Sequence, residues 1–379
     1  MIITTYSLKN YYLNKKKTLK YFSVLSYFIL GRLFSLLFLY LVLQKGCKIS
    51  QFNPPFCLSN KHLQTVYSTL IAKEINVEFT IEKFPLSDGD FLEAYWHKTN
   101  KPNKQNALVI LFHGLAGNYK SPYIQGNIQA LAKAGYDTVI MHFRGCAELP
   151  NTLPRSYHSG ETGDAKEFLI AIKAKNNYSQ IFCMGFSLGA NVLLKLLGEL
   201  QENKLIDGAV AVSPPMQLDV CANAIDHGIS KYYQYRLVKE LNKALDAKYD
   251  MHNMEQLIGL KREEIQNIKT FWEFDEVYTA PIHGFKSAQD YYTKCSSRQF
   301  LHKIQTPTLI IHSEDDPFMS PSIIPTQKEV SKFVTLDIQK KGGHVGFVEG
   351  SFFKPKYWLE TKVVQYFKSL SCNLYQTHS

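Results

Sequence analysis

Residues 180–200 read Q-I-F-C-M-G-F-S-L-G-A-N-V-L-L-K-L-L-G-E-L, an apolar run followed by a G-x-S-x-G motif and a leucine-rich stretch. The run predicts a buried strand, and the apolar residues after the motif recur at helical spacing. A strand that turns sharply into a helix at Ser187 is the typical setting of a nucleophilic serine. Gly185 and Gly189 fit this interpretation, because side chains there would collide with the strand and helix that the turn joins. A lone motif of this kind also occurs by chance, so the serine needs partners elsewhere in the chain.

Candidate partners follow in the chain order serine, aspartate, histidine. Residues 308–319 read T-L-I-I-H-S-E-D-D-P-F-M, a buried-strand pattern that ends in carboxylates, and open parallel sheets place their sites at this edge. Asp316 is the preferred carboxylate because it directly precedes a proline after the strand, and Asp315 is the alternative. His344, in a glycine-rich loop, is the candidate base, since a serine hydroxyl is a poor nucleophile until an imidazole takes its proton. The carboxylate would fix the tautomer of that imidazole and stabilise its charged form.

The negative charge that develops during acyl transfer needs two backbone N–H groups directed at it. Leu188, directly after the serine, is expected to supply one of them. Residues 107–117, A-L-V-I-L-F-H-G-L-A-G, predict a strand that runs into a His-Gly loop, where Leu115 is the expected second donor. His113 in this loop is interpreted as a packing residue that holds the backbone in shape, rather than as a catalytic base.

Several long motifs resemble a known family. They are H-L-Q-T (62–65), F-H-G-L-A-G-N-Y-K-S-P-Y (112–123), M-H-F-R-G-C (141–146), Y-H-S-G-E-T-G-D (157–164), D-D-P-F-M (315–319) and G-G-H-V-G-F (342–347). With them, residues 54–370 resemble the YheT-type α/β-hydrolases, which have membrane-anchored mammalian relatives. The resemblance implies a serine hydrolase with carboxylesterase or acylglycerol-lipase-like activity. Its triad matches Ser187, Asp316 and His344.

The alternation of short apolar runs with helical stretches predicts the same fold class. A hairpin at residues 77–83 and 91–96 is expected to open the sheet, because a Ser-Asp-Gly-Asp turn separates the two runs. The later strands are expected at 107–112, 138–142, 180–184, 208–212, 308–312 and 334–338. Such a pattern is typical of an α/β fold with a mostly parallel central sheet and helices on both faces. The α/β-hydrolase domain is expected to span residues 51–375.

Residues 216–305 form an aromatic-rich, mostly helical insertion after a core strand. At this place an insertion is expected to act as a cap that excludes water and shapes an apolar acyl pocket. Phe186, Met216 and Phe318 are expected to neighbour that pocket because each is adjacent in sequence to a predicted loop of the site.

Two motifs between the predicted hairpin and the serine invite other interpretations. Arg144 has the chemistry to bind a carboxylate or phosphate, and His158 with Glu161 suggests a metal pair. A buried network of arginine, glutamate and hydrogen bonds beneath the active site is the preferred interpretation, because two potential ligands without a third make a weak metal site. We therefore expect no metal and no cofactor.

The formal net charge of +10 comes largely from the N-terminus and does not indicate nucleic-acid binding. Residues 1–50 contain eight lysines and arginines and no acidic residue, whereas the rest of the chain is nearly balanced. Within this extension, residues 21–43 are long and apolar enough to cross a bilayer. Arg32 near the middle of the segment makes insertion costlier by roughly 2.5–3.5 kcal/mol. A membrane anchor, an interfacial attachment and a wrongly assigned upstream start are the three interpretations.

Seven scattered cysteines, without a paired motif, favour a reducing compartment and a hydrolase domain on the cytoplasmic side of a membrane. A soluble cytoplasmic protein is the alternative if the extension is not translated. The expected activity is hydrolysis of carboxylic esters, with an acyl or lipid-derived small-molecule substrate and no nucleic-acid partner. Thioester hydrolysis or acyl transfer on the same triad, and a non-catalytic membrane-associated binding protein, are the alternatives. The sequence does not determine the oligomeric state.

Overall fold

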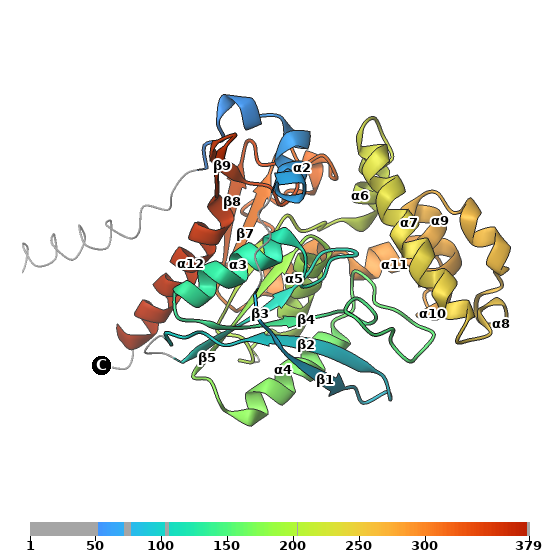
Figure 1. The fold of residues 1–379 in the computed structure, drawn as a ribbon, viewed down its shortest axis with the longest axis horizontal. Coiled ribbons are helices and arrows are strands. Elements are labelled where there is room, and N and C mark those ends of the chain that lie inside the picture. The colour runs from blue at the N-terminus through green and yellow to red at the C-terminus, as the bar shows by residue number, and fades with distance from the viewer. Residues whose placement is uncertain (1–51, 72–76, 103–105, 203, 377–379) are drawn as a thin grey trace, which may run out of the picture. The chain divides into compact units, whose positions relative to one another are not determined.

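The computed structural model describes residues 52–71, 77–102, 106–202 and 204–376. Within them, eight strands form one sheet in the order β1-β2-β4-β3-β5-β6-β7-β8 (Figure 1). Neighbouring strands from β4 to β8 run parallel, whereas β2 pairs antiparallel with both β1 and β4. The strands are β1 (Thr80–Pro85), β2 (Phe91–His97), β3 (Ala107–Phe112), β4 (Asp137–Met141), β5 (Gln180–Phe186), β6 (Gly208–Val212), β7 (Thr308–Ser313) and β8 (Val334–Gln339).

Helices cover both faces of the sheet because its central strands are apolar on both sides. Every residue of β3 and β5 is buried. One core cluster joins the sheet to α3 and α12, and a second joins its other face to α4 and α5. The predicted fold class is therefore confirmed. These helices are α3 (Pro122–Lys133), α4 (Gly163–Lys175), α5 (Leu188–Leu200) and α12 (Trp358–Gln376).

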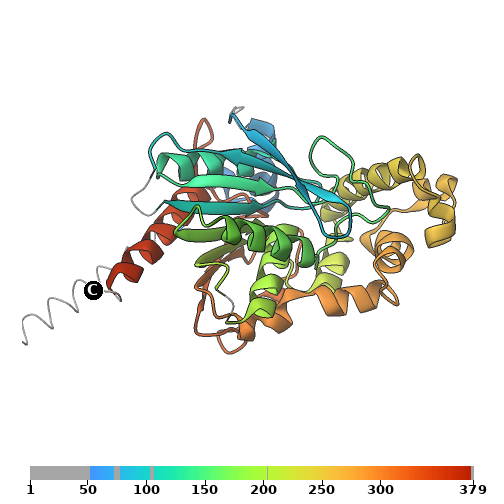
Figure 2. The ribbon, with the colours of Figure 1, turned by 90° about the horizontal axis from the view of Figure 1, so that it is seen from below.

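The chain between β6 and β7 forms the helical insertion, which lies at one end of the sheet, on the right in Figures 1 and 2. Phe274 and Tyr278 belong to a small core that the insertion builds for itself around its longest helix. Its elements are α6 (Leu218–Ile225), α7 (Ser230–Tyr249), α8 (Met254–Ile258), η2 (Arg262–Asn267), α9 (Phe271–Phe274), the π-helical turn η3 (Asp275–Thr279), α10 (Ala280–Ile282), α11 (Ala288–Cys295) and η4 (Ser297–Lys303).

A small lobe that the sequence analysis did not predict combines the first described helices with a hairpin that precedes α12. It comprises η1 (Phe56–Leu58), α2 (Lys61–Ile71) and a hairpin of β9 (Val348–Ser351) and β10 (Lys354–Tyr357), and η5 (Pro321–Ile323) is a separate short turn. The buried amide of Gln64 fastens the lobe: it donates to the carbonyl oxygens of Leu58 and Val348 and accepts from the N–H of Val348. Such complete pairing allows a polar side chain to be buried.

The predicted strands agree with the observed ones to within a few residues; the first begins at Thr80 rather than residue 77. The candidate membrane segment, residues 21–43, lies outside the described residues. Among the helices that the structure does describe, none has the length and apolar character that crossing a bilayer requires.

Candidate active site

Ser187 occupies the sharp turn between β5 and α5, as the motif predicts. Its backbone has φ 50° and ψ −119°, a strained conformation for a residue with a side chain. A Cβ on Gly185 would lie 2.6 Å from the carbonyl oxygen of Gly189, and one on Gly189 would lie 2.4 Å from that of His113. Both glycines are therefore required for the helix to approach the sheet closely enough to hold this turn.

His344 lies against the serine on a loop between β8 and β9. Its Nε2 is 2.9 Å from Oγ of Ser187 and its Nδ1 is 2.8 Å from Oδ2 of Asp316. The backbone N–H of His344 donates to Oγ1 of Thr65, on α2 of the lobe. The ring of Phe318 stacks on the imidazole, with centroids 4.1 Å apart and 14° between planes. The imidazole is thus fixed by its backbone, its ring face and both of its nitrogens.

The two neighbouring aspartates have different contacts. Asp316 is buried, contacts the imidazole and accepts the backbone N–H of Phe318 at 2.8 Å. Asp315 instead accepts the backbone N–H of Gly343 at 3.0 Å, and burial raises its pKa. The preferred carboxylate, Asp316, contacts the ring of His344, and the alternative, Asp315, contacts the backbone of the loop that carries this histidine.

The two residues predicted to donate to an oxyanion, Leu115 and Leu188, both lie at the cavity that contains the serine. Among the described residues, the backbone N–H groups of Leu115 and Leu188 have no hydrogen-bond acceptor. Both residues line the same cavity as Ser187. The loop of Leu115 is held by Tyr123, whose hydroxyl accepts the N–H of Gly114 at 3.0 Å. Free, pre-oriented donors beside a nucleophile are the arrangement that an oxyanion hole requires.

His113 holds this loop from beneath and does not face the serine. Its Nδ1 donates to the carbonyl oxygen of Gly114 at 2.7 Å, and its Nε2 accepts the N–H of Phe143 at 3.1 Å. Complete burial lowers the pKa of His113 to about 3, so the ring is neutral and fits one donor and one acceptor role. These contacts agree with its interpretation as a packing residue.

Comparison with known proteins gives a consistent family. Residues 107–351 match the model of the alpha/beta hydrolase fold family. The chain is 36% identical over 327 residues to YheT of Escherichia coli (strain K12), a provisionally assigned esterase; the match spans 85% of this chain and 96% of that protein. The chain belongs to the YheT-type α/β-hydrolases. The family predicted from the sequence motifs is therefore confirmed.

More distant relatives of this α/β-hydrolase have lipase names. The monoacylglycerol lipase of Saccharomyces cerevisiae (strain ATCC 204508 / S288c) is 25% identical over 73% of this chain and 63% of its own length. Phospholipase ABHD3 of Mus musculus is 24% identical over 76% of this chain and 71% of its own. The protein is thus a hydrolase of a family whose members include esterases and lipases.

A cavity of about 660 Å³ lies between the α/β-hydrolase core and the helical insertion, directly over Ser187. Its lining is mainly aliphatic and aromatic, and the insertion contributes side chains from α6, α7, α9 and α11. Phe318 lines the cavity as predicted, but Phe186 and Met216 do not, since both side chains are fully buried in the core clusters on the two faces of the sheet. Such a volume suits an apolar small molecule such as an acyl chain.

One half-buried carboxyl group lies in the wall of this cavity. Asp275 opens the π-helical turn, and one of its oxygens accepts the hydroxyl of Tyr292 at 2.7 Å. Burial raises the pKa of Asp275 to about 6. π-Helical turns are rare overall but often lie at functional sites. Sequence patterns do not identify such a turn, so they did not single out Asp275.

Arg144 is buried in an ionic network, as predicted, but its partners differ from the prediction. The guanidinium pairs with Asp88 and Asp90 at 2.9 Å each and with Asp164 at 2.7 Å. Glu161, the predicted partner, pairs with Arg155 at 3.0 Å instead. The turn before β2 brings Asp88 and Asp90 to Arg144, a tertiary contact that local sequence does not report, and Asp164 lies in the first turn of α4. Arg144 is buried and does not line the cavity, so it is unsuited to bind a substrate anion.

The pair His158 and Glu161 gains a third potential ligand from the insertion. His283 places a ring nitrogen so that the three ligand atoms lie within 4.8 Å of one another. However, Nδ1 of His158 accepts the N–H of Gly160 at 3.1 Å, so the neutral ring carries its proton on Nε2, which faces Glu161. Burial lowers the pKa of His158 to about 3, which keeps the ring neutral. This tautomer offers no lone pair toward Glu161, and we interpret the cluster as a contact between core and insertion.

Two positioning residues were missed by the sequence analysis. Thr65 falls in the H-L-Q-T motif, which served only as a family signal, and the structure shows it holding the backbone of His344. Asn191, the last residue of C-M-G-F-S-L-G-A-N, donates to the carbonyl oxygens of Ser159 and Cys295 and accepts the N–H of Ser297. It joins the helix after the serine to the insertion. The sequence did contain a sign of this role, because Asn191 is a polar residue on an otherwise apolar helix face.

Proposed function

We propose that the protein hydrolyses carboxylic esters of acyl or lipid-derived substrates through Ser187, His344 and Asp316. The observation that carries the proposal is the 2.9 Å contact between Oγ of Ser187 and Nε2 of His344 on the floor of an apolar cavity. The esterase and lipase names of the relatives and the acyl-sized cavity support the choice of substrate. The insertion, residues 216–305, acts as the cap of this site.

In the first half of the reaction, Oγ of Ser187 bonds to the ester carbonyl carbon while its proton passes to Nε2 of His344. Asp316 accepts the Nδ1 proton in a hydrogen bond throughout and stabilises the imidazolium without taking its proton. The carbonyl oxygen becomes an oxyanion and receives hydrogen bonds from the N–H groups of Leu115 and Leu188. Collapse of this intermediate breaks the ester bond, and the alcohol leaves with the proton from His344.

In the second half, a water molecule attacks the acyl-enzyme and gives its proton to His344. The new oxyanion collapses, the bond to Ser187 breaks, and the acid leaves as the proton returns to the serine oxygen. The apolar wall of the cavity holds the acyl chain. A thiol leaving group or an alcohol acceptor would use the same steps, so the choice among ester, thioester and transfer chemistry rests on substrate tests.

The test compares the wild type, Ser187→Ala and the control Ser369→Ala, whose hydroxyl bonds within α12 away from the cavity. Each protein is assayed with p-nitrophenyl esters and acyl thioesters and labelled with a fluorophosphonate. We expect turnover and labelling in the wild type and the control, and neither in Ser187→Ala. Labelling with turnover of thioesters alone would replace the ester assignment. A folded wild type without labelling would support the non-catalytic alternative.

A further inference from the structure

The small lobe formed by η1, α2 and the β9–β10 hairpin carries exposed aromatic side chains. Phe56 is 97% exposed and Phe353 is 90% exposed, the two highest values among the described large hydrophobic residues. Phe353 packs edge-on against Phe352, whose ring packs against Tyr67 of α2. These aromatic side chains therefore project from a folded support. Exposed phenylalanines held in this way indicate a surface that contacts something apolar.

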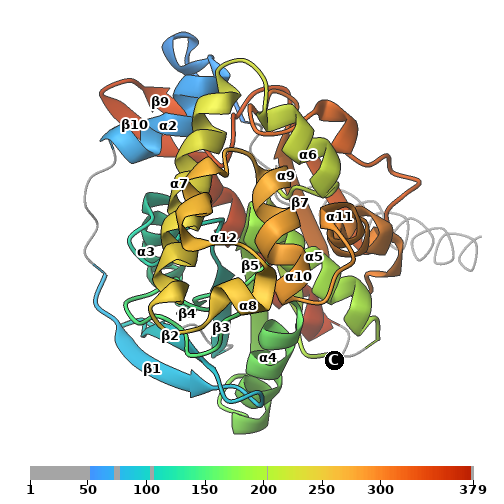
Figure 3. The same ribbon diagram turned by 90° about the vertical axis from the view of Figure 1, so that its right-hand side faces the viewer.

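The first turns of α7 extend this surface beside the opening of the cavity. Ile229 is 65% exposed and Tyr232 is 58% exposed. The next residue, Tyr233, stacks on His62 of α2, and its hydroxyl lies 3.1 Å from the ring nitrogen Nδ1. Because the exposed Tyr232 also lines the cavity, the cavity reaches the surface here. Figures 1 and 3 show η1, α2 and the start of α7 at the same end of the molecule.

We define the docking face as the exposed apolar residues of these two parts: Phe56, Leu63, Phe352, Phe353, Ile229 and Tyr232. Basic side chains accompany it, since Lys61, Lys354 and Lys356 are exposed on the lobe and Arg236 is exposed at the cavity lining. Residues 52–63 contain no acidic residue. Aromatic side chains surrounded by lysine and arginine are the composition that binds the interface of an anionic bilayer.

The N-terminal residues that precede this face in the sequence are also basic and partly apolar. Residues 1–50 carry eight basic residues, no acidic ones and the apolar stretch 21–43. The described structure begins at Phe52, which packs edge-on against Phe347 and lies four residues before Phe56, the first residue of η1. A segment suited to a membrane is thus connected to the lobe that presents the exposed phenylalanines.

We propose that the docking face binds the surface of an anionic lipid bilayer, so that the cavity opens toward the lipid and an acyl substrate enters from it. This inference rests on the proposed ester hydrolysis and adds the lipid bilayer as the source of the substrate. Binding itself does not depend on catalysis, so it is tested without turnover.

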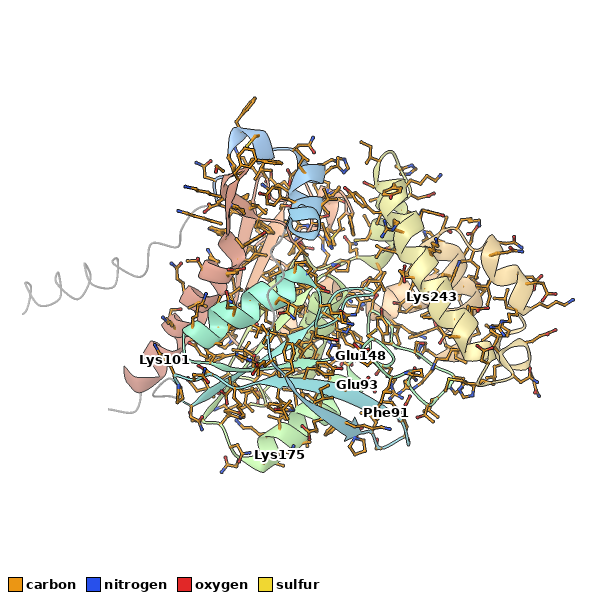
Figure 4. All side chains as sticks on the ribbon, viewed as in Figure 1. Phe91, Glu93, Lys101, Glu148, Lys175 and Lys243 are labelled. Atoms are coloured by element: carbon orange, nitrogen blue, oxygen red, sulfur yellow. The ribbon has the colours of Figure 1, made fainter. Side chains whose placement is uncertain are left out.

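The first test measures whether the lobe enters the bilayer in the full chain. Phe353→Trp is mixed with vesicles of phosphatidylcholine and phosphatidylglycerol, with or without brominated acyl chains, and the signal of the three native tryptophans is subtracted with the wild type. The control is Ile170→Trp, at a position 47% exposed on α4. That helix, whose last residue Lys175 is labelled in Figure 4, lies at the opposite end of the molecule from η1.

We expect brominated lipid to quench the added fluorescence of Phe353→Trp and not that of Ile170→Trp. No added quenching in Phe353→Trp, or equal quenching in both variants, would overturn the proposal and direct attention to a protein partner for the face. This result is independent of whether the protein hydrolyses esters.

The second test separates docking from catalysis. The double variant Phe56→Ser and Phe353→Ser is assayed with a soluble p-nitrophenyl ester and with the same acyl group presented in anionic vesicles. We expect an unchanged rate on the soluble ester and a loss of about tenfold on vesicles, because two apolar anchors are removed. Equal rates on vesicles in variant and wild type would contradict the proposal. The circular dichroism spectrum shows whether the double variant is folded. A loss of rate on both substrates in a folded variant would also contradict the proposal.

Discussion

Oδ2 of Asp316 lies 2.8 Å from Nδ1 of His344, while the adjacent Asp315 binds the backbone of the loop that carries this histidine. Two neighbouring carboxylates thus have separate roles on the same loop. One contacts the imidazole, and the other positions the backbone around it. The difference can be measured because the two residues differ only in where their side chains point.

We expect Asp316→Asn to lower kcat/KM by about 10⁴-fold, the effect of removing the carboxylate from a serine-hydrolase triad, because the imidazole loses its tautomer and its stabilised charge. Asp315→Asn keeps an oxygen that accepts the N–H of Gly343 and should lose about tenfold or less. Ester hydrolysis by the two variants, at equal labelled concentration, gives the comparison. Equal losses would mean that the proposed roles are wrong.

Gly189→Ala should destabilise the protein by about 1–3 kcal/mol or more, since the new Cβ would lie 2.4 Å from the backbone oxygen of His113. The matched control is Gly163→Ala at the exposed first residue of α4, where a Cβ would meet only a carboxylate oxygen of Glu161 at 3.1 Å. Urea unfolding of both variants measures the change. A Gly189→Ala protein as stable as the control would show that the turn is not held by close packing.

Asn191→Ala should lower the free energy of unfolding by about 2–4 kcal/mol, because three buried backbone groups lose their partners at once. Asn253→Ala is the control; it removes an exposed cap of α8 and should cost about 1 kcal/mol. Thermal and urea denaturation report the difference. A cost no larger than that of the control would mean that Asn191 does not hold the insertion to the core.

Stability should fall as the pH drops below about 6.5. Burial lowers the pKa of His312 to about 4, so the folded protein keeps this ring neutral while the unfolded chain binds a proton. Its contribution is complete above the unfolded pKa and is lost toward pH 4, at about 1.4 kcal/mol per pH unit. His312→Asn should therefore reduce the slope of unfolding free energy against pH. The exposed His227→Asn is the control, and an equal slope in both variants would refute the expectation.

Ala222→Phe should shorten the preferred acyl chain, because Ala222 is 5% exposed and lines the cavity above Ser187. We expect kcat/KM on a p-nitrophenyl decanoate to fall about tenfold or more relative to the butyrate, since filling a pocket removes the burial of several methylenes. Ala224→Phe, on the same helix but outside the cavity, should leave that ratio unchanged. Parallel losses on both esters in Ala222→Phe would show that the acyl chain lies elsewhere.

Local patterns were sufficient for the fold class and for the candidate triad. The strand, turn and helix around Ser187 follow from apolar spacing and two glycines, because these act between neighbouring residues. Ser187, Asp316 and His344 each follow a predicted strand. Because parallel strands end at the same edge of a sheet, the three residues are expected to lie together there. The sequence motifs also predicted the family, which the comparisons confirm.

The contacts that complete the site required the tertiary structure. Thr65 and His344 are far apart in the chain, and Arg144 pairs with Asp88 and Asp90 of a distant turn in addition to Asp164, and not with Glu161. Such pairings depend on which segments the sheet and lobe bring together, and a linear pattern does not encode them. By itself the sequence determined the strands, the turn and the reactive residue types. It also favoured Asp316 over Asp315 and predicted an apolar pocket under the insertion. The separate contacts of the two aspartates, the residues that line the cavity and the exposed lobe were decided only by packing, because each is a relation between surfaces distant in sequence.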